Sequence, residues 1–150
     1  MTGALIEGTD GPDDLDDRRP MGDGFHDPGT DDTIRAYFGP DHITIHNGND
    51  TVYGGYEQDF IVDQGTGNDR MYGEFGADTF HIGPGNDTVD GGLANDGVFY
   101  SSSQQLVALD LESGSAIAEG IDTLISIEHV TGSSGNDVLR GNAVNNMLSG

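Results

Sequence analysis

Residues 48–98 read GNDTVYGGYEQDFIVDQGTGNDRMYGEFGADTFHIGPGNDTVDGGLANDGV, and an aspartate returns in this stretch every nine or ten positions. An apolar residue stands two positions after each of these aspartates, as Val52 follows Asp50, and a glycine often stands two positions before, as Gly48 does. The unit is G-G-x-G-x-D-x-U-x, in which U is apolar. A fixed short period of this kind is the sequence signature of a repeat architecture.

The repeat continues beyond this stretch in both directions. Toward the N-terminus, four more aspartates each have an apolar residue two positions later: Asp13, Asp23, Asp32 and Asp41. Near the C-terminus Asp137 restarts the pattern, and Asn146 takes the aspartate position nine residues later. Residues 97–131 depart from the repeat, but apolar residues alternate around Leu109, which indicates strands there.

These boundaries predict how the chain is organised. We expect one domain over residues 1–150, with a first repeat block at 8–99, a strand-containing insert at 100–131 and a second block at 132–150. We expect the second block to be cut short at Gly150, because another unit would begin there.

Each unit divides into a six-residue turn and a three-residue strand. Strand residues alternate between two faces, so U points to one side and its neighbours to the other. One unit buries a single side chain, and only stacked units line up a continuous core. With two units per turn of a flattened coil, residues 18 or 19 apart lie above each other at the strand spacing of about 4.8 Å. The sequence therefore predicts an all-β fold, a parallel β-roll with two nonapeptide repeats per turn.

The charge of the chain leaves two readings open. It has 21 Asp, 6 Glu, 5 Arg and no Lys, with a formal net charge of −22. A chain with so much charge and only 33% apolar residues could be disordered, because little apolar burial offsets the entropy of ordering. It could instead be a cation binder whose ligands are the carboxylates. The regular period favours the cation binder.

Several function classes are excluded by the composition. Strong negative charge repels nucleic acid and anionic membrane surfaces. No stretch approaches the roughly 18 apolar residues of a membrane span, and there is no Cys for disulfides or thiolate metal sites. H-E-x-x-H, G-x-S-x-G, a P-loop and an EF-hand loop are also missing, so we expect no enzyme activity.

The stacked aspartates predict metal sites between successive coils. Carboxylates at strand spacing repel each other, and a cation between them removes that repulsion. With only oxygen ligands, including the carbonyls of glycine-rich turns, Ca²⁺ fits better than Mg²⁺ or Zn²⁺. We expect several Ca²⁺ ions. The expected ligand residues are Asp32, Asp41, Asp50, Asp59, Asp69, Asp78, Asp87, Asp96, Asp137, Gly48, Gly67, Gly76 and Gly85.

Two histidines offer an alternative metal site. His42 and His46 are four residues apart, but this spacing does not make side chains converge on strands and turns. We expect them to be exposed histidines of a strand and a turn.

The Gly-Asn-Asp triplets at 48–50, 67–69 and 85–87 resemble the calcium-binding repeats of the RTX (haemolysin-type) family. The resemblance covers 8–99 and 132–150 and is most specific in 48–99. It implies a right-handed β-roll with Ca²⁺ between consecutive turns. It also implies export of the unfolded chain by a type I pathway, with folding triggered by extracellular calcium.

Three functions are consistent with these features. The first is a calcium-responsive secretion and folding module of an exported bacterial protein, attached to further domains of a parent polypeptide. The second is a structural or adhesive β-roll at the cell surface, with self-association or a surface glycan as partner. The third, a fragment of a secreted hydrolase, is disfavoured because the repeats begin near residue 8.

Overall fold

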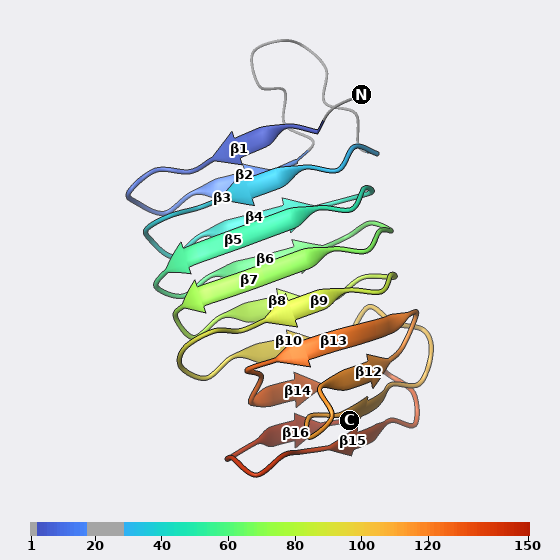
Figure 1. The fold of residues 1–150 in the computed structure, drawn as a ribbon. Helices are drawn as coiled ribbons and strands as arrows, with labels where there is room; N and C mark the ends of the chain where they lie inside the picture. Colours follow the sequence, from blue (N-terminus) through green and yellow to red (C-terminus); the bar gives the residue numbers. More distant parts are fainter. Residues whose placement is uncertain (1–2, 18–28) are drawn as a thin grey trace.

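The computed structural model describes residues 3–17 and 29–150. In these residues the chain forms sixteen short strands and no helix, so no described helix could cross a membrane. The strands wind into a stack of flattened coils that runs from the blue N-terminal end to the red C-terminal end (Figure 1). The predicted parallel β-roll is therefore confirmed.

The strands form two sheets on opposite sides of the coil. The nine-stranded sheet has the order β1-β3-β5-β7-β9-β13-β12-β11-β15, and the seven-stranded sheet has the order β16-β14-β10-β8-β6-β4-β2. The first contains β1 (Leu5–Glu7), β3 (Thr33–Arg35), β5 (Thr51–Tyr56), β7 (Arg70–Phe75), β9 (Thr88–Asp90), β11 (Ala108–Asp110), β12 (Ser115–Ile117), β13 (Ile121–Ile125) and β15 (Val138–Arg140). The second contains β2 (Asp14–Asp16), β4 (His42–Ile45), β6 (Phe60–Asp63), β8 (Thr79–His81), β10 (Gly97–Phe99), β14 (His129–Thr131) and β16 (Met147–Ser149).

The register of the parallel strands confirms two units per coil. Val52 pairs with Ile34, which is 18 residues earlier, and with Met71, which is 19 residues later. In the other sheet Ile61 pairs with Ile43 and Phe80 in the same way. Successive U residues therefore lie directly above one another.

The first coil does not follow the period. Ile6 pairs with Ile34, 28 residues later, and Asp14 pairs with His42 at the same separation. Asp13 shows the same separation, because its backbone N–H bonds to the carboxylate of Asp41, 28 residues later. Asp23 lies outside the described residues.

The insert is a hairpin excursion inside the nine-stranded sheet. β13 pairs in parallel with β9, so Leu124 takes the place after Val89 in the core column. β12 then runs antiparallel to both β13 and β11, and β15 resumes parallel pairing on β11. The strands expected around Leu109 are therefore present, and the excursion returns the chain to the roll.

Two columns of apolar side chains form the core. Each unit contributes its U residue, and these are at most 5% exposed from the second coil as far as β14. The columns are Ile34, Val52, Met71, Val89 and Leu124 on one sheet, and Ile43, Ile61, Phe80, Val98 and Val130 on the other. Ala36, Ile45 and Ile82 add to these columns at the corners, but the core is still thin for so many glycine-rich turns, whose ordering is entropically costly.

Candidate metal-binding turns

The turns that lead from the seven-stranded sheet into the nine-stranded sheet carry one column of acidic side chains. We name this column ladder 1: Asp32, Asp50, Asp69, Asp87 and Asp122. The backbone N–H of each member donates to Oδ1 of the next, at 2.7 Å from Asp50 to Asp69 and 2.9 Å from Asp69 to Asp87. All five side chains are buried. One oxygen of each carboxylate from Asp50 onward is thus fixed by the preceding coil.

The turns on the opposite side carry a second column. We name it ladder 2: Asp13, Asp41, Asp59, Asp78, Asp96 and Glu128. Here too each backbone N–H donates to the next carboxylate, as from Asp59 to Asp78 at 2.8 Å. The two ladders therefore confirm the expected stacking of aspartates 18 or 19 residues apart.

The second oxygen of most ladder carboxylates has no protein partner. Among the described residues, buried Oδ2 atoms without a hydrogen bond belong to Asp41, Asp50, Asp59, Asp69, Asp78, Asp87, Asp96 and Asp137. Leaving a buried polar atom without a partner costs about 1–3 kcal/mol, and more for a charged group. These atoms form rows along both sides of the roll, which is the arrangement needed by a cation held between coils.

Burial weakens the ionisation of the ladders when no cation is present. Desolvation raises the pKa of Asp50, Asp69 and Asp87 to about 7, helped by neighbouring carboxylates. It raises the pKa of Asp59 to about 7 and that of Asp78 to about 6. At effective dielectric constants near 20, like charges about 4.8 Å apart repel by about 3–4 kcal/mol. A divalent cation would oppose both effects.

The two sets of turns have different backbones. In the turns of ladder 2, the second and fourth residues of each G-G-x-G-x-D unit between residues 37 and 94 have a left-handed backbone conformation. Gly55 (φ 113°) and Gly76 (φ 154°) are examples. Where glycine is missing the conformation is kept, as at Glu57 (φ 79°) and Ala94 (φ 104°). Glu57 and Ala94, which stand where the G-G-x-G-x-D pattern has glycine, therefore change the strain of the turn and not its shape.

The turns of ladder 1 are closed by a row of asparagines. Asn68 N–H donates to Asn49 Oδ1, Asn86 N–H donates to Asn68 Oδ1, and Ile121 N–H donates to Asn86 Oδ1, each at 2.9 Å. A Cβ on Gly67 would lie 1.7 Å from the Gly48 carbonyl oxygen. The Gly-Asn-Asp triplets therefore allow the backbones of successive turns to approach closely.

The predicted site residues separate into groups. The eight aspartates from Asp32 to Asp96 lie on the two ladders. Gly48, Gly67 and Gly85 lie in the turns of ladder 1, and Gly76 lies in a turn of ladder 2. Asp137 is separated from them by the hairpin, and its Oδ1 accepts hydrogen bonds from Val107 N–H and the Ser133 hydroxyl.

Sequence reasoning missed four acidic residues of this region. Asp122 and Glu128 extend the ladders, and Asp17 and Asp63 are buried beside ladder 1. Asp122 and Glu128 could have been found, because each stands two residues before a core apolar residue. Asp63 could have been suspected, because it lies in the ten-residue interval between Asp59 and Asp69.

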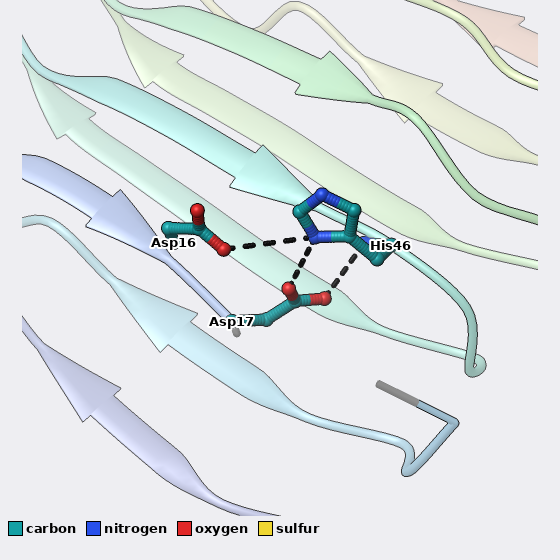
Figure 2. Close-up of side chains that lie close together, drawn as sticks. All are labelled: Asp16, Asp17 and His46. Carbon is teal, nitrogen blue, oxygen red and sulfur yellow. Dashed lines mark hydrogen bonds and ion pairs between the residues drawn. The ribbon is translucent and has the colours of Figure 1, made fainter. Parts of the chain in front are cut away.

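The expectation of exposed histidines holds for His42 and is wrong for His46. His46 is 6% exposed, and both oxygens of the buried Asp17 carboxylate face it, one at the ring Nδ1 and one at the backbone N–H (Figure 2). Asp16 lies 3.7 Å from the same ring nitrogen. The imidazole is enclosed because the buried carboxylate of Asp17, the residue after β2, packs against it, which no spacing in the sequence indicated.

Fold and turns together define a parallel β-roll with calcium-binding turns. The model of the RTX calcium-binding nonapeptide repeat matches residues 29–61, 63–98 and 127–150 in four copies, which is more than half of the chain. The chain therefore belongs to the RTX calcium-binding repeat family, whose nonapeptides bind Ca²⁺. No curated protein matches the chain.

Proposed function

We propose that this chain is a calcium-dependent folding module of an exported bacterial protein. Its ladder carboxylates, together with Asp137 and the carbonyls of Gly48, Gly67, Gly76 and Gly85, hold several Ca²⁺ ions between consecutive coils. The observation that carries the proposal is the row of buried Oδ2 atoms without a protein partner. Hard oxygen ligands with flexible spacing suit Ca²⁺, which takes 6–8 oxygens at 2.3–2.6 Å.

The same carboxylates make folding depend on the ion. Without Ca²⁺ the net charge of −22 and the stacked carboxylates favour an expanded chain. Extracellular calcium modules bind at roughly 10⁻⁴–10⁻³ M, so the roll forms where calcium is plentiful. Ligands that bind only the folded state stabilise it by mass action. Membership of the RTX family supports a location outside the cell.

The proposed module is one domain over residues 1–150, in which residues 8–99 and 132–150 form the roll and 100–131 form the hairpin insert. Its acidic side chains act as ligands and supply no catalytic step. Any activity belongs to other domains of the parent polypeptide.

The test is far-UV circular dichroism of chelator-treated protein during a Ca²⁺ titration, with Mg²⁺ as the control. A cooperative gain of β signal in Ca²⁺ and not in Mg²⁺ is expected. A full β signal in excess chelator that Ca²⁺ leaves unchanged would contradict calcium-dependent folding.

A strip of exposed aromatic rings favours a second candidate, a structural or adhesive roll. Phe38, Tyr56 and Phe75 stack at centroid distances of 4.8 and 4.7 Å along the turns of ladder 2, and each is 46–48% exposed. Leu93 extends the strip and is 63% exposed. Sedimentation velocity in saturating Ca²⁺ tests this role. Association that Tyr56→Ser abolishes would support it, and a monomer at all concentrations would contradict self-association.

A further inference from the structure

One position at the corner of the seven-stranded sheet is apolar in the neighbouring coils and acidic in the coil of β6. Asp63 pairs in register with Ile45 of the preceding coil. In the following coil His81 pairs with Val62, so Ile82, the next residue, takes the place that corresponds to Asp63. Ile45 and Ile82 are core residues, at most 2% exposed. Asp63 occupies the same column with 5% exposure, so its carboxylate is buried where an aliphatic side chain packs on either side.

Backbone groups hold this carboxylate in one orientation. Gly65 N–H donates to Oδ1 at 2.9 Å, and Gly83 N–H donates to Oδ2 at 3.1 Å. A Cβ on Gly83 would lie 2.5 Å from Oδ2, so the carboxylate uses space that only glycine leaves. Two neutral N–H groups do not neutralise the buried charge.

The carboxylate lies beside two members of ladder 1. One oxygen each of Asp63, Asp69 and Asp87 fall within 4.8 Å of one another. The Oδ2 atoms of Asp69 and Asp87 are buried and have no hydrogen-bond partner among the described residues. An ion about 2.4 Å from each of two oxygens can bridge a separation of 4.8 Å, which is within the Ca²⁺–oxygen range.

We propose that Asp63, Asp69 and Asp87 form a three-carboxylate Ca²⁺ site that binds more tightly than the turns in which two ladder carboxylates share an ion. This deepens the proposed function and rests on it. Affinity in oxygen cages rises with the number of charged ligands and with their rigidity, and Asp63 supplies both. The site fills first and joins the coils of β7 and β9 before the others close.

The related cluster around Asp17 is different. Asp17 lies close to Asp32 and Asp50, but both of its oxygens already face His46. The oxygens of Asp63 instead accept from the neutral backbone N–H groups of Gly65 and Gly83. The tight site is therefore assigned to Asp63.

The test is isothermal calorimetry of the whole chain with Ca²⁺, repeated by luminescence with Tb³⁺, on wild type, Asp63→Asn and Asp63→Ile. The isoleucine variant copies Ile45 and Ile82 and is expected to fold in Ca²⁺. In both variants the number of bound ions falls by one, and the tightest phase weakens about tenfold or more. Asp90→Asn removes the same charge from an outward strand position and keeps the tight phase.

Each outcome is decisive. Unchanged stoichiometry and affinity in both Asp63 variants would overturn the assignment while leaving calcium-dependent folding intact. If Asp63→Ile fails to fold in saturating Ca²⁺, the ion count and the affinity of Asp63→Asn decide the assignment, and wild-type values in that variant overturn it. A wild type that binds no Ca²⁺ would reject the proposed function and this site together.

Discussion

The Tyr100 hydroxyl donates a 2.8 Å hydrogen bond to Oδ2 of Asp122. In Asp50, Asp69 and Asp87 the corresponding oxygen has no partner, whereas in Asp122 a protein group occupies it. Tyr100 is 1% exposed and belongs to the connection that follows β10. Ladder 1 thus changes at the hairpin insert from carboxylates open to a cation to a carboxylate satisfied by the chain.

Removing that hydroxyl should destabilise the folded roll. In Tyr100→Phe the buried Asp122 oxygen loses its donor, which costs about 1.5–3 kcal/mol for a hydrogen bond to a charged group. Thermal unfolding in saturating Ca²⁺ should therefore show a lower midpoint, by roughly 3–12 °C for a chain of this size. Tyr72→Phe, on the outer face of β7, is the control and should leave the midpoint unchanged.

Without calcium the fold should be favoured by acid. The pKa of Asp50, Asp59, Asp69 and Asp87 in the folded state is about 7, above the ordinary value of 3.8. The folded chain then binds more protons than the unfolded chain between these values. The resulting stability is fully present below about pH 4 and is lost as the pH rises through 7. Circular dichroism in chelator should show more β structure at pH 5 than at pH 8, and the reverse order would contradict the burial of these groups.

Replacing one ladder carboxylate by its amide should separate fold from ion binding. In Asp78→Asn the Oδ1 that accepts from Asp59 N–H is retained, while the anionic Oδ2 is lost. The calcium midpoint of folding should rise about 3- to 10-fold, because a charged ligand is lost from the cage. Asp90→Asn serves as the matched control. Equal midpoints for the two variants would remove Asp78 from the set of ligands.

The left-handed turns predict one stabilising substitution. Ala94 has φ 104°, a conformation that costs a non-glycine residue about 1–2 kcal/mol. Ala94→Gly removes this strain but adds about 0.5–1 kcal/mol of backbone entropy, so a net gain of about 0.5–1 kcal/mol is expected. Ala77→Gly, one residue before its ladder aspartate and without positive φ, should destabilise the roll. Chemical denaturation in saturating Ca²⁺ measures both changes.

Most of the roll could be predicted because one short period sets the strands, the core and the ladder positions together. Prediction failed where the period is interrupted. Asp122 carries the D-x-U pattern with Leu124, but it follows Asp96 by 26 residues because a hairpin intervenes. The nine-residue series also fails at the first coil, where the Asp13 backbone N–H bonds to the Asp41 carboxylate 28 residues later.

The environment of single side chains was harder to predict than the strands. His46 and Asp63 occupy turn and corner positions that elsewhere hold glycine or isoleucine, and the pattern alone does not say whether a polar side chain there faces inward. Their burial depends on contacts between coils distant in sequence, such as that of His46 with Asp17. Such contacts appear only once the register is known.

The direction of the ladder hydrogen bonds makes the two faces of every coil different. Asp50, Asp69 and Asp78 each offer a carboxylate oxygen toward the N-terminal side and a backbone N–H toward the C-terminal side. Along the ladders the N-terminal side of a coil therefore presents carboxylate acceptors and its C-terminal side presents backbone donors, whereas the asparagine row of ladder 1 runs the other way. Two roll segments of this sequence can be joined with matched hydrogen bonds only head to tail, because like faces would oppose carboxylate to carboxylate. The stack has a built-in polarity, like a filament with unequal ends.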